Sequence, residues 1–407
     1  MPNQSCCSGS SAAKKKSAGC CGGGTSTATP HQLQPVVKNQ NCCSDTKPAE
    51  TGSSQKASGC GGAVQPCEWI SGSVQTPVGE VPRVGTTLSS ADVLDAWKCR
   101  WGIGRMDYAI DPGLYCVGNP DAQALVLVTS NYKMTFDRLR KELSGLDAWI
   151  VVLDTDGINV WCAAGKGTFS TEELVNRLQA TRLLEIVSHR TIILPQLGAS
   201  GVAAHLVAKQ SGFRVVYGPV RACDIKGFLK AGMQATDEMR TVRFTFRDRL
   251  VLTPVELIAA LKKVIIVFGV MFILTATGLG QYGLIDLYAF LGAVFVGTVF
   301  APALLPWIPG RAFSLKGFFP GFLLAVGIIL INGFLPASAY NWLRAAAYLL
   351  LLPALSAFWT INFTGSSTYT SLSGVDKEMR IALPIMIIST GIGAILMLVN
   401  DLIHGFG

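Results

Sequence analysis

The chain has 407 residues, of which 50% are hydrophobic and 15% charged, and its formal net charge is +8. Aromatic residues are rarely interleaved with the basic ones, which argues against a nucleic-acid-binding protein. Composition divides the chain into a tail rich in Ser, Gly and Cys (1–66), a part of ordinary globular composition (67–256) and an overwhelmingly apolar part (257–407). The middle part is long enough to bury a core of its own.

The tail contains three pairs of adjacent cysteines, Cys6-Cys7, Cys20-Cys21 and Cys42-Cys43. Adjacent thiolates can hold one soft ion such as Hg(II), and the absence of C-x-x-C disfavours a zinc ribbon or an iron–sulfur cluster. A compositionally biased tail with no defined role is the alternative interpretation. Residues 1–25 lack the apolar segment of a signal peptide, so we expect the parts before the membrane to be cytoplasmic and their thiols reduced.

The middle part alternates short apolar strands with amphipathic helices. Strands are predicted at 124–129, 148–153, 191–194 and 213–217, and helices at 136–146, 174–189 and 201–210. Ser170 and Glu173 fit a capping box at the start of the second helix. This alternation predicts an α/β fold with a mostly parallel sheet, whose ligands bind at the carboxyl ends of the strands.

The middle part contains no motif that indicates nucleotide binding, and it contains few residues arranged as in common catalytic sites. No G-x-G-x-x-G follows a strand and no G-x-x-x-x-G-K-[ST] is present. A Cys–His hydrolase pairing Cys162 with His189 is conceivable. A capping or surface role for His189 and a packed position for His205 are the favoured interpretations.

The run Asn159-Val160-Trp161-Cys162-Ala163-Ala164-Gly165-Lys166 carries the strongest chemical signal. It places one cysteine between a tryptophan and two alanines, just before a small-residue turn. A thiolate at this position could act as a soft metal ligand or as a nucleophile. An inert buried cysteine is the default interpretation for a single Cys.

This run reproduces the cap-helix motif of the HgcA family, the membrane-bound corrinoid proteins of microbial mercury methylation, which the chain resembles over about residues 83–407. The resemblance continues in the segments 111–115, 128–133, 194–199, 212–221 and 247–257. It implies a Rossmann-like domain that holds a cobalamin-type corrinoid, with Cys162 as the lower axial ligand of cobalt. Asn159, Val160, Trp161, Ala163, Ala164, Gly165 and Lys166 would shape the helix capping that face. The Asp-x-His-x-x-Gly motif, which commonly supplies a histidine to cobalt, is absent.

The resemblance implies a methyltransferase that moves a methyl group from cobalt to Hg(II) and forms methylmercury. A ferredoxin-like partner with iron–sulfur clusters is expected as the electron donor, because cobalt must return to Co(I). The domain is also similar to the corrinoid iron–sulfur protein of the acetyl-CoA pathway, so a methyl carrier of one-carbon metabolism is an alternative. A membrane metal-binding or transport protein is a third hypothesis.

Five apolar segments approach or exceed the length needed to cross a bilayer as a helix. They lie at about 263–279, 284–305, 317–335, 342–361 and 381–403. Positive residues before the first span and between later spans predict a multi-pass protein of the cytoplasmic (inner) membrane, with residues 67–256 in the cytoplasm and the C-terminus outside. Ionisable residues are scarce within these spans, which favours an all-α transmembrane anchor of five helices over a charge-coupled pump.

Overall fold

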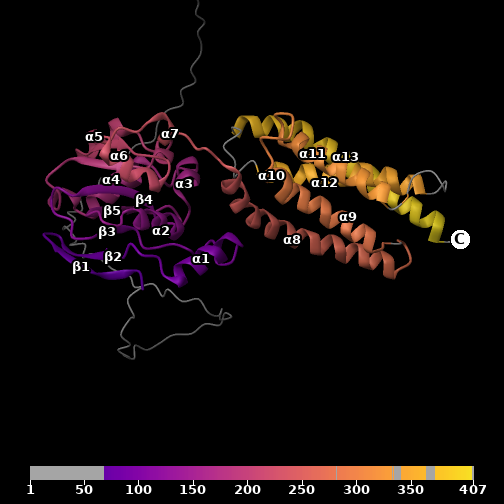
Figure 1. Ribbon diagram of the computed structural model, residues 1–407, viewed down its shortest axis with the longest axis horizontal. Helices are drawn as coiled ribbons and strands as arrows, with labels where there is room; N and C mark the ends of the chain where they lie inside the picture. The colour runs from indigo at the N-terminus through magenta and orange to yellow at the C-terminus, as the bar shows by residue number, and fades with distance from the viewer. Residues whose placement is uncertain (1–67, 281, 332, 334–340, 364–371, 406–407) are drawn as a thin grey trace, which may run out of the picture. The chain divides into compact units, whose positions relative to one another are not determined.

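A computed structural model describes residues 68–405 except 281, 332, 334–340 and 364–371. The paired cysteines of the tail, Cys6 to Cys43, lie outside the described residues. The described chain forms an α/β unit followed by a series of long apolar helices (Figure 1). The predicted fold class, an α/β domain followed by five apolar helices, is therefore confirmed.

The α/β unit is built on one seven-stranded sheet with the order β1-β2-β3-β5-β4-β6-β7. Its strands are β1 (Ile70–Thr76), β2 (Gly79–Val84), β3 (Gly113–Val117), β4 (Leu125–Ser130), β5 (Ala148–Leu153), β6 (Thr191–Leu194) and β7 (Arg214–Tyr217). The strands β5, β4, β6 and β7 are mutually parallel, as predicted. The antiparallel hairpin β1–β2 and the antiparallel strand β3 beside β5 were not predicted.

Helices cover both faces of the sheet. They are α1 (Ser90–Arg100), α2 (Lys133–Glu142), α3 (Val160–Lys166), α4 (Thr171–Ala180), α5 (Ala204–Ser211), α6 (Ile225–Lys230) and α7 (Asp237–Arg240), with 3-10 turns η1 (Leu183–Glu185), η2 (Gln196–Gly198) and η3 (Ala222–Asp224). Alternate β5 residues enter two separate cores: Trp149 and Val151 pack under α3, α4 and α5, whereas Ile150 and Val152 pack under α2 and α6. Burial on both faces explains why β5 is continuously apolar.

The helix predicted at 174–189 is shorter than expected. It ends at Ala180, and Arg182 then adopts a left-handed conformation (φ 49°) before η1. The Ser170 hydroxyl accepts a hydrogen bond from the Glu173 backbone N–H, as the sequence predicted. The Glu173 carboxylate does not complete the capping box, because it accepts from the backbone N–H of Asp154 instead.

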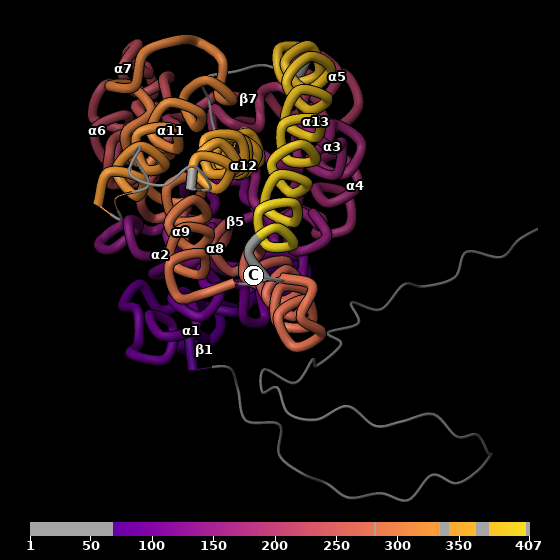
Figure 2. The backbone as a smooth tube through the Cα atoms, turned by 90° about the vertical axis from the view of Figure 1, so that its right-hand side faces the viewer, coloured from indigo at the N-terminus to yellow at the C-terminus, as the bar shows by residue number. Residues whose placement is uncertain are grey.

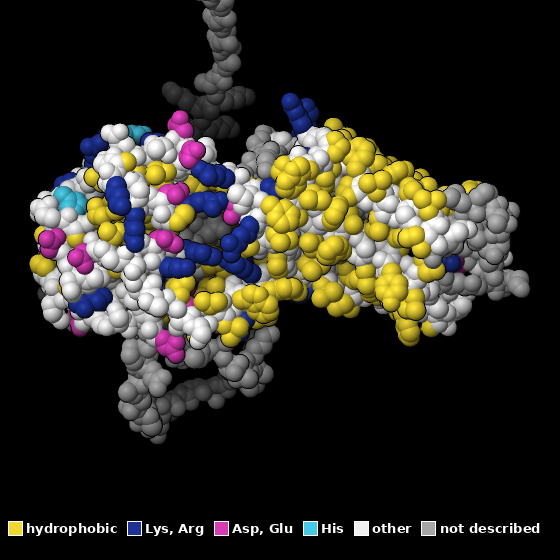
Figure 3. Space-filling model, in the orientation of Figure 1, with side chains coloured by type: hydrophobic (Ala, Val, Ile, Leu, Met, Phe, Trp, Pro, Cys, Tyr) yellow, Lys and Arg dark blue, Asp and Glu magenta, His cyan; other side chains and the backbone are white. Residues whose placement is uncertain are grey.

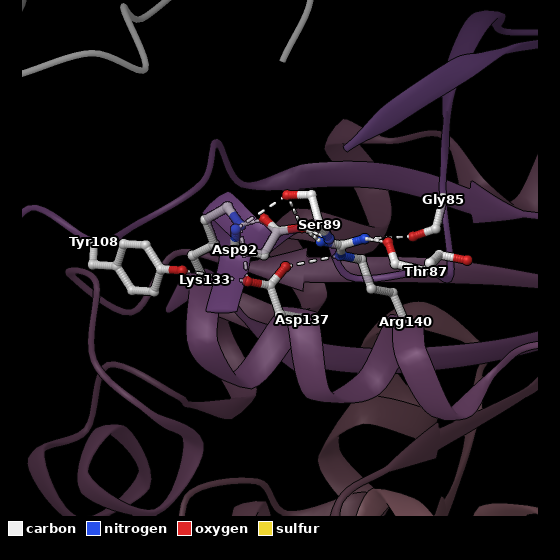
Figure 4. A network of polar contacts seen from close by, with 8 residues as sticks. All are labelled: Gly85, Thr87, Ser89, Asp92, Tyr108, Lys133, Asp137 and Arg140. Atoms are coloured by element: carbon white, nitrogen blue, oxygen red, sulfur yellow. Dashed lines mark hydrogen bonds and ion pairs between the residues drawn. The ribbon is translucent and has the colours of Figure 1, made fainter. Parts of the chain in front are cut away.

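A buried ion network joins α1 to α2 (Figure 4). The fully buried Arg140 donates from Nη2 to Asp92 Oδ2 (2.7 Å) and from Nε to Asp137 Oδ1 (2.8 Å). Lys133 Nζ bridges the same two carboxylates at 2.6 and 2.8 Å. Arg140 Nη1 also donates to the Gly85 carbonyl at 2.6 Å, so that two cations and two carboxylates are balanced and hydrogen-bonded.

The C-terminal part consists of apolar helices. They are α8 (Phe246–Ala276), α9 (Leu284–Phe295), which continues through the π-helical segment η4 (Val296–Phe300) into α10 (Ala301–Ala303), and α11 (Phe313–Ile331), α12 (Asn341–Asn362) and α13 (Leu372–Gly405). Length and composition make five helical stretches of the described residues candidates for membrane spans. The first begins at Phe246 and not at residue 263, because a capping box of Thr245 and Asp248 starts α8 earlier.

The helix α12 packs against α9, α11 and α13 (Figure 2). Small residues permit the close approach: a Cβ on Gly317 would lie 2.7 Å from Ala357 Cα, and one on Gly321 2.7 Å from Ser356 Cβ. The buried Asp286 carboxylate accepts from Arg344 Nη2 (2.6 Å) and Tyr348 Oη (2.5 Å). These contacts link α9 to α12 and satisfy a carboxylate within an apolar bundle.

We expect Arg140→Met to lower the free energy of unfolding by about 3–5 kcal/mol, because it leaves the Asp92 and Asp137 carboxylates buried beside a single cation. Arg138→Met is the matched control on the same helix, since Arg138 is exposed and has no ion pair among the described residues. It should change the free energy by less than about 0.5 kcal/mol. Urea titration of the full chain in detergent, followed by tryptophan fluorescence, measures both. Equal effects would contradict a structural role for the network.

The same network predicts an acid-dependent loss of stability. Burial raises the pKa of Asp92, but hydrogen bonds from Lys133, the Ser89 backbone and Arg140 outweigh it and lower the pKa from 3.8 to about 2. A lowered pKa stabilises the fold above the unfolded value, and this stabilisation is lost as the pH falls from about 4 to about 2. The difference corresponds to about 2 kcal/mol. Urea titrations across this range should show a steeper decline for the native chain than for Asp92→Asn, and parallel declines would refute the assignment.

Candidate functional site

The Asn131 side chain organises the carboxyl edge of the sheet, where the parallel strands β4 and β5 end. Its Oδ1 accepts from Thr155 N (3.1 Å), Thr155 Oγ1 (2.7 Å) and Gly157 N (3.1 Å), and its Nδ2 donates to Asp154 Oδ1 (3.1 Å). Asp156 and Gly157 both adopt positive φ, 54° and 67°, which lets the loop turn tightly around the amide. Asn131 thereby fixes the segment that leads into α3.

The helix α3 starts and ends at well-defined caps. The Asn159 side chain accepts from the backbone N–H of Cys162 at 2.9 Å, and Gly167 closes the helix in a left-handed conformation (φ 87°). Val160 and Ala164 are buried, whereas Cys162 is half-buried and Gly165 is exposed. The motif therefore presents its cysteine on the outer side of a short, firmly capped helix.

The small residues of the motif let α3 sit close to the sheet edge. A Cβ on Gly201 would lie 2.1 Å from the Phe169 carbonyl oxygen and 3.1 Å from Ala164 Cα. Ala163 is fully buried in the same core. The two alanines therefore face the domain, and Gly165 is the small residue that remains open, since a Cβ there would meet no atom within 4 Å.

Trp161 lies 37% exposed and not in the core, where a tryptophan is most commonly found. Trp161, Cys162, Gly165 and Lys166 occupy the outward side of α3, because helical positions four apart share a face. The outward side thus combines an aromatic ring, a thiol and an open glycine.

Three buried polar atoms near α3 have no hydrogen-bond partner among the described residues. They are Ser130 Oγ at the end of β4, Thr168 Oγ1 just after α3, and Gln196 Oε1 in η2. The helix α3 contacts both β4 and η2, so all three atoms belong to its surroundings. Buried polar groups are normally satisfied, and such a group of exceptions fits a site whose ligand supplies the missing partners.

An acidic hollow of about 330 Å³ adjoins the end of α3. Asp154, Asp156, Glu172 and Glu173 line it together with Thr168. The Asp154 carboxylate accepts from Asn131, and the Glu173 carboxylate accepts from Arg177 at 2.8 Å. The Asp154 and Glu173 carboxylates therefore already serve to fix the loop and α4.

The remaining candidate residues do not join Cys162. His189 lies at the opposite edge of the sheet, before β6, where Nε2 is 2.9 Å from the Ala124 carbonyl and Nδ1 accepts from Thr191 N at 3.2 Å. The Cys–His hydrolase interpretation is therefore wrong. His189 also caps no helix, because α4 already ends at Ala180, and its ring instead contacts the backbone beside β4 and β6. His205 is exposed and not packed. Within residues 68–405 as described, no group of three or more His, Cys, Asp or Glu side chains could hold a metal ion.

Cys162 differs from the other cysteines of the described chain. Cys99 and Cys116 are buried, and Cys223 is exposed on η3. Burial raises the pKa of the Cys116 thiol to about 11 despite the charge of Arg83, which keeps this thiol protonated. Cys162 alone combines partial exposure with a place at the carboxyl edge of the parallel strands.

Sequence reasoning identified the segments at this edge but missed the roles of individual residues. In the sequence, residues 128–133 are one of the segments that carry the family resemblance, and nothing in them assigns a role to Asn131. Asn131 holds the loop after β5 through hydrogen bonds to residues 24 to 26 positions further along the chain. Ser130 Oγ is left without a partner because of the way α3 packs against β4. No local pattern could have revealed them.

The α/β unit resembles subunits of carbon monoxide and acetyl-CoA enzymes. Residues 97–229 match the family described as CO dehydrogenase/acetyl-CoA synthase delta subunit. The acetyl-CoA decarbonylase/synthase complex subunit gamma of Methanocaldococcus jannaschii is 31% identical over 140 residues, which cover 34% of this chain and 28% of that protein. The same subunit of Archaeoglobus fulgidus is 28% identical over 128 residues, covering 31% and 27%.

A gamma 2 subunit of Methanosarcina thermophila is 32% identical over 133 residues, again covering 31% of this chain and 27% of the relative. The chain thus spans little more than a quarter of the length of these curated relatives. The matched family region contains β3 to β7 and the whole of α3. Cys162 therefore lies within the residues that match the CO dehydrogenase/acetyl-CoA synthase delta subunit family.

Proposed function

We propose that the α/β unit binds a cobalamin-type corrinoid against the outward side of α3 and serves in methyl transfer. The half-buried Cys162 on a capped helix is the observation that carries this proposal. The partnerless atoms Ser130 Oγ, Thr168 Oγ1 and Gln196 Oε1 support it, because a corrinoid bears many amide groups able to satisfy them. The similarity to acetyl-CoA decarbonylase/synthase subunits supports it further.

The N-cap Asn159 and three outward residues of α3 have distinct parts in this proposal. The Cys162 thiolate would be the lower ligand of cobalt, since a thiolate is a soft, electron-rich donor. Asn159 holds the backbone of Cys162 in place through its cap. Gly165 leaves room for a large planar ligand beside the helix, and Trp161 offers its exposed ring to the same ligand. The corrinoid would supply the transferable methyl group, and the protein supplies ligation, orientation and access.

We propose Hg(II) as the acceptor, so that the product is methylmercury. The support is the complete motif from Asn159 to Lys166, with its single cysteine. Hg(II) is a soft electrophile, and a corrinoid held by the soft Cys162 thiolate would supply a methyl group suited to such an acceptor. The cysteine pairs of the tail, at residues 6–7, 20–21 and 42–43, would bind Hg(II) on this proposal.

A methyl carrier of acetyl-CoA-pathway-like metabolism is the second candidate. It is favoured by the relatives, which are named as subunits of the acetyl-CoA decarbonylase/synthase complex. Both candidates require a low-potential electron donor, for which we propose a ferredoxin-like protein with iron–sulfur clusters. Both also place the chain in the cytoplasmic membrane, with which the five candidate spans are compatible.

We expect Cys162→Ala to change the visible spectrum of the full chain reconstituted with cobalamin, because the thiolate no longer reaches cobalt. Methyl transfer to Hg(II) should fall by at least about tenfold. Cys223→Ala is the matched control, since Cys223 is a free cysteine outside the site. An unchanged spectrum in Cys162→Ala would refute the ligand assignment. Failure of the native chain to retain cobalamin would refute corrinoid binding.

The acceptor is tested separately with the methylated full chain. Hg(II) and a methyl-accepting acetyl-CoA decarbonylase/synthase preparation are offered in parallel, and the methyl products are quantified. Preferential formation of methylmercury supports the first candidate. Transfer only to the enzyme complex would support the carrier and exclude Hg(II) as the principal acceptor.

We expect Gly165→Ala to separate cofactor binding from folding. The added methyl group meets no protein atom, and alanine favours the helix by up to about 1 kcal/mol, so the unfolding midpoint should stay constant or rise. Cobalamin affinity should nevertheless fall by about tenfold, because the methyl group would stand where the ligand approaches. Gly201→Ala is the contrasting variant, which should destabilise the domain itself. Unchanged cobalamin affinity in Gly165→Ala would place the ligand elsewhere.

A further inference from the structure

The helix α1 turns the side that carries Asp92 toward the interior of the α/β unit and leaves its apolar side exposed. Asp92 is buried on the inner side of the helix, as is Cys99, whose Sγ lies 3.1 Å from Tyr132 Oη. The outer side carries Val93, Leu94 and Trp97, whose exposed fractions are between 51% and 58%. A surface helix normally shows the opposite arrangement, with apolar residues facing the core.

The buried ion network explains this inverted packing (Figure 4). Asp92 is held by both Arg140 and Lys133, and it also caps α1 through the Ser89 backbone N–H at 3.0 Å. Rotating α1 to bury its apolar side would move Asp92 into solvent. Arg140 would then remain buried without one of its two carboxylate partners. The apolar side of α1 is therefore kept outward by the fold itself.

The segment after α1 continues the exposed apolar surface. Ile103 and Met106 are 60% and 73% exposed, and the ring of Trp101 lies 5.6 Å from that of Trp97. A Cβ on Gly102 would lie 3.7 Å from Ile258 Cγ2, which places this segment beside α8. The helix α8 is also the first candidate membrane span. The exposed apolar surface is thus continuous with the start of the apolar helices.

Four arginines lie in the same region: the charges of Arg138 and Arg247 act on Arg100, and Arg105 and Arg100 both act on Tyr132. None of them has a carboxylate partner among the described residues, whereas the nearby Lys98 pairs with Asp95. Burial and then the charge of Arg138 lower the pKa of Arg100, and Arg247 adds to the effect, so these side chains repel one another. Figure 3 shows Lys and Arg side chains gathered on the visible face of the α/β unit.

We propose that this surface docks on the bilayer. We call it the membrane-contact surface, and it consists of Val93, Leu94, Trp97, Ile103 and Met106 together with Arg100, Arg105, Arg138 and Arg247. The apolar side chains and Trp97 enter the interfacial layer, and the arginines bind the phosphates of anionic phospholipids. The combination of exposed tryptophan, aliphatic residues and arginine is typical of segments that lie in a membrane interface.

Lipid fits this surface better than a protein partner does. Arg247 belongs to the first turn of α8, the helix that continues as the first candidate span, so the head groups lie within its reach. Four arginines without counterions match a negatively charged leaflet, where each contributes about fivefold in affinity. The proposal is independent of the cofactor, because none of these residues belongs to α3.

The first test measures whether Trp97 meets lipid. The full chain is placed in nanodiscs of phosphatidylcholine and phosphatidylglycerol, and the Trp97 signal is the fluorescence difference between the native chain and Trp97→Phe. We expect lipids brominated near the head group to quench this signal and aqueous acrylamide to quench it weakly. Leu184→Trp is the control, because Leu184 is 46% exposed on η1 and should be quenched by acrylamide alone.

The second test measures the dependence on anionic lipid. Lipid quenching of Trp97 should be strong with phosphatidylglycerol and should fall several-fold in discs of phosphatidylcholine alone. Arg100→Gln combined with Arg138→Gln should remove this dependence, and the exposed, distant Arg214→Gln should not. The unfolding midpoint of each variant verifies that the domain remains folded.

Two results would overturn the proposal. Equal quenching of Trp97 by acrylamide in both kinds of disc would show a water-exposed surface free for a protein partner. Identical lipid dependence in the double arginine variant and in Arg214→Gln would show that these arginines do not bind head groups. Neither outcome bears on cobalamin retention, so the test is separable from that of the proposed function.

Discussion

The buried guanidinium of Arg140 is the constraint on which the arrangement of the α/β unit depends. A fully buried cation is tolerated only with charge compensation and hydrogen bonds. Asp92 and Asp137 supply the compensating charge, and the Gly85 and Thr87 carbonyls accept further hydrogen bonds from Nη1. These partners come from α1, α2 and the segment after β2. The network therefore fixes three parts of the chain at once, and it decides that α1 turns its apolar side outward. Hydrophobic burial alone would favour the opposite orientation, with Val93, Leu94 and Trp97 facing the core.

A second polar centre, Asn131, gives the candidate site its rigidity. It joins the ends of β4 and β5 through four hydrogen bonds, and the loop that it holds leads directly to the Asn159 cap of α3. The close approach at Gly201 then seats the helix on the edge of the sheet. A ligating thiol must be held within a narrow range of positions to be useful to a bound metal. The supporting residues thus matter as much as Cys162 itself.

The sequence predicted the repetitive features of the fold better than the singular ones. Continuous apolar runs predicted the first and last residues of β5 and β6 correctly. A strand buried on both faces is apolar along its whole length, so the apolar run ends where the strand ends. The inverted helix α1 gave no such signal, since its orientation follows from a charge network spanning 48 residues between Asp92 and Arg140. At the site, the motif predicted Cys162, whereas the exposure of Trp161 and the inward direction of Ala163 depend on how α3 packs.

The connection between the α/β unit and the apolar helices is short, and this alters the energetics of membrane contact. Only residues 241–245 separate α7 from α8, and Arg221 pairs with Asp248 in the first turn of α8 at 2.6 Å. On the proposal that α8 spans a membrane, a domain joined so closely to it would meet the bilayer as an intramolecular event, at a high effective concentration. Contacts of modest strength are then sufficient to select one orientation. The ion network joins α1 to α2, and both α2 and α3 contact β4. An orientation that the surface of α1 adopts at a membrane would therefore also orient the capped cysteine of α3.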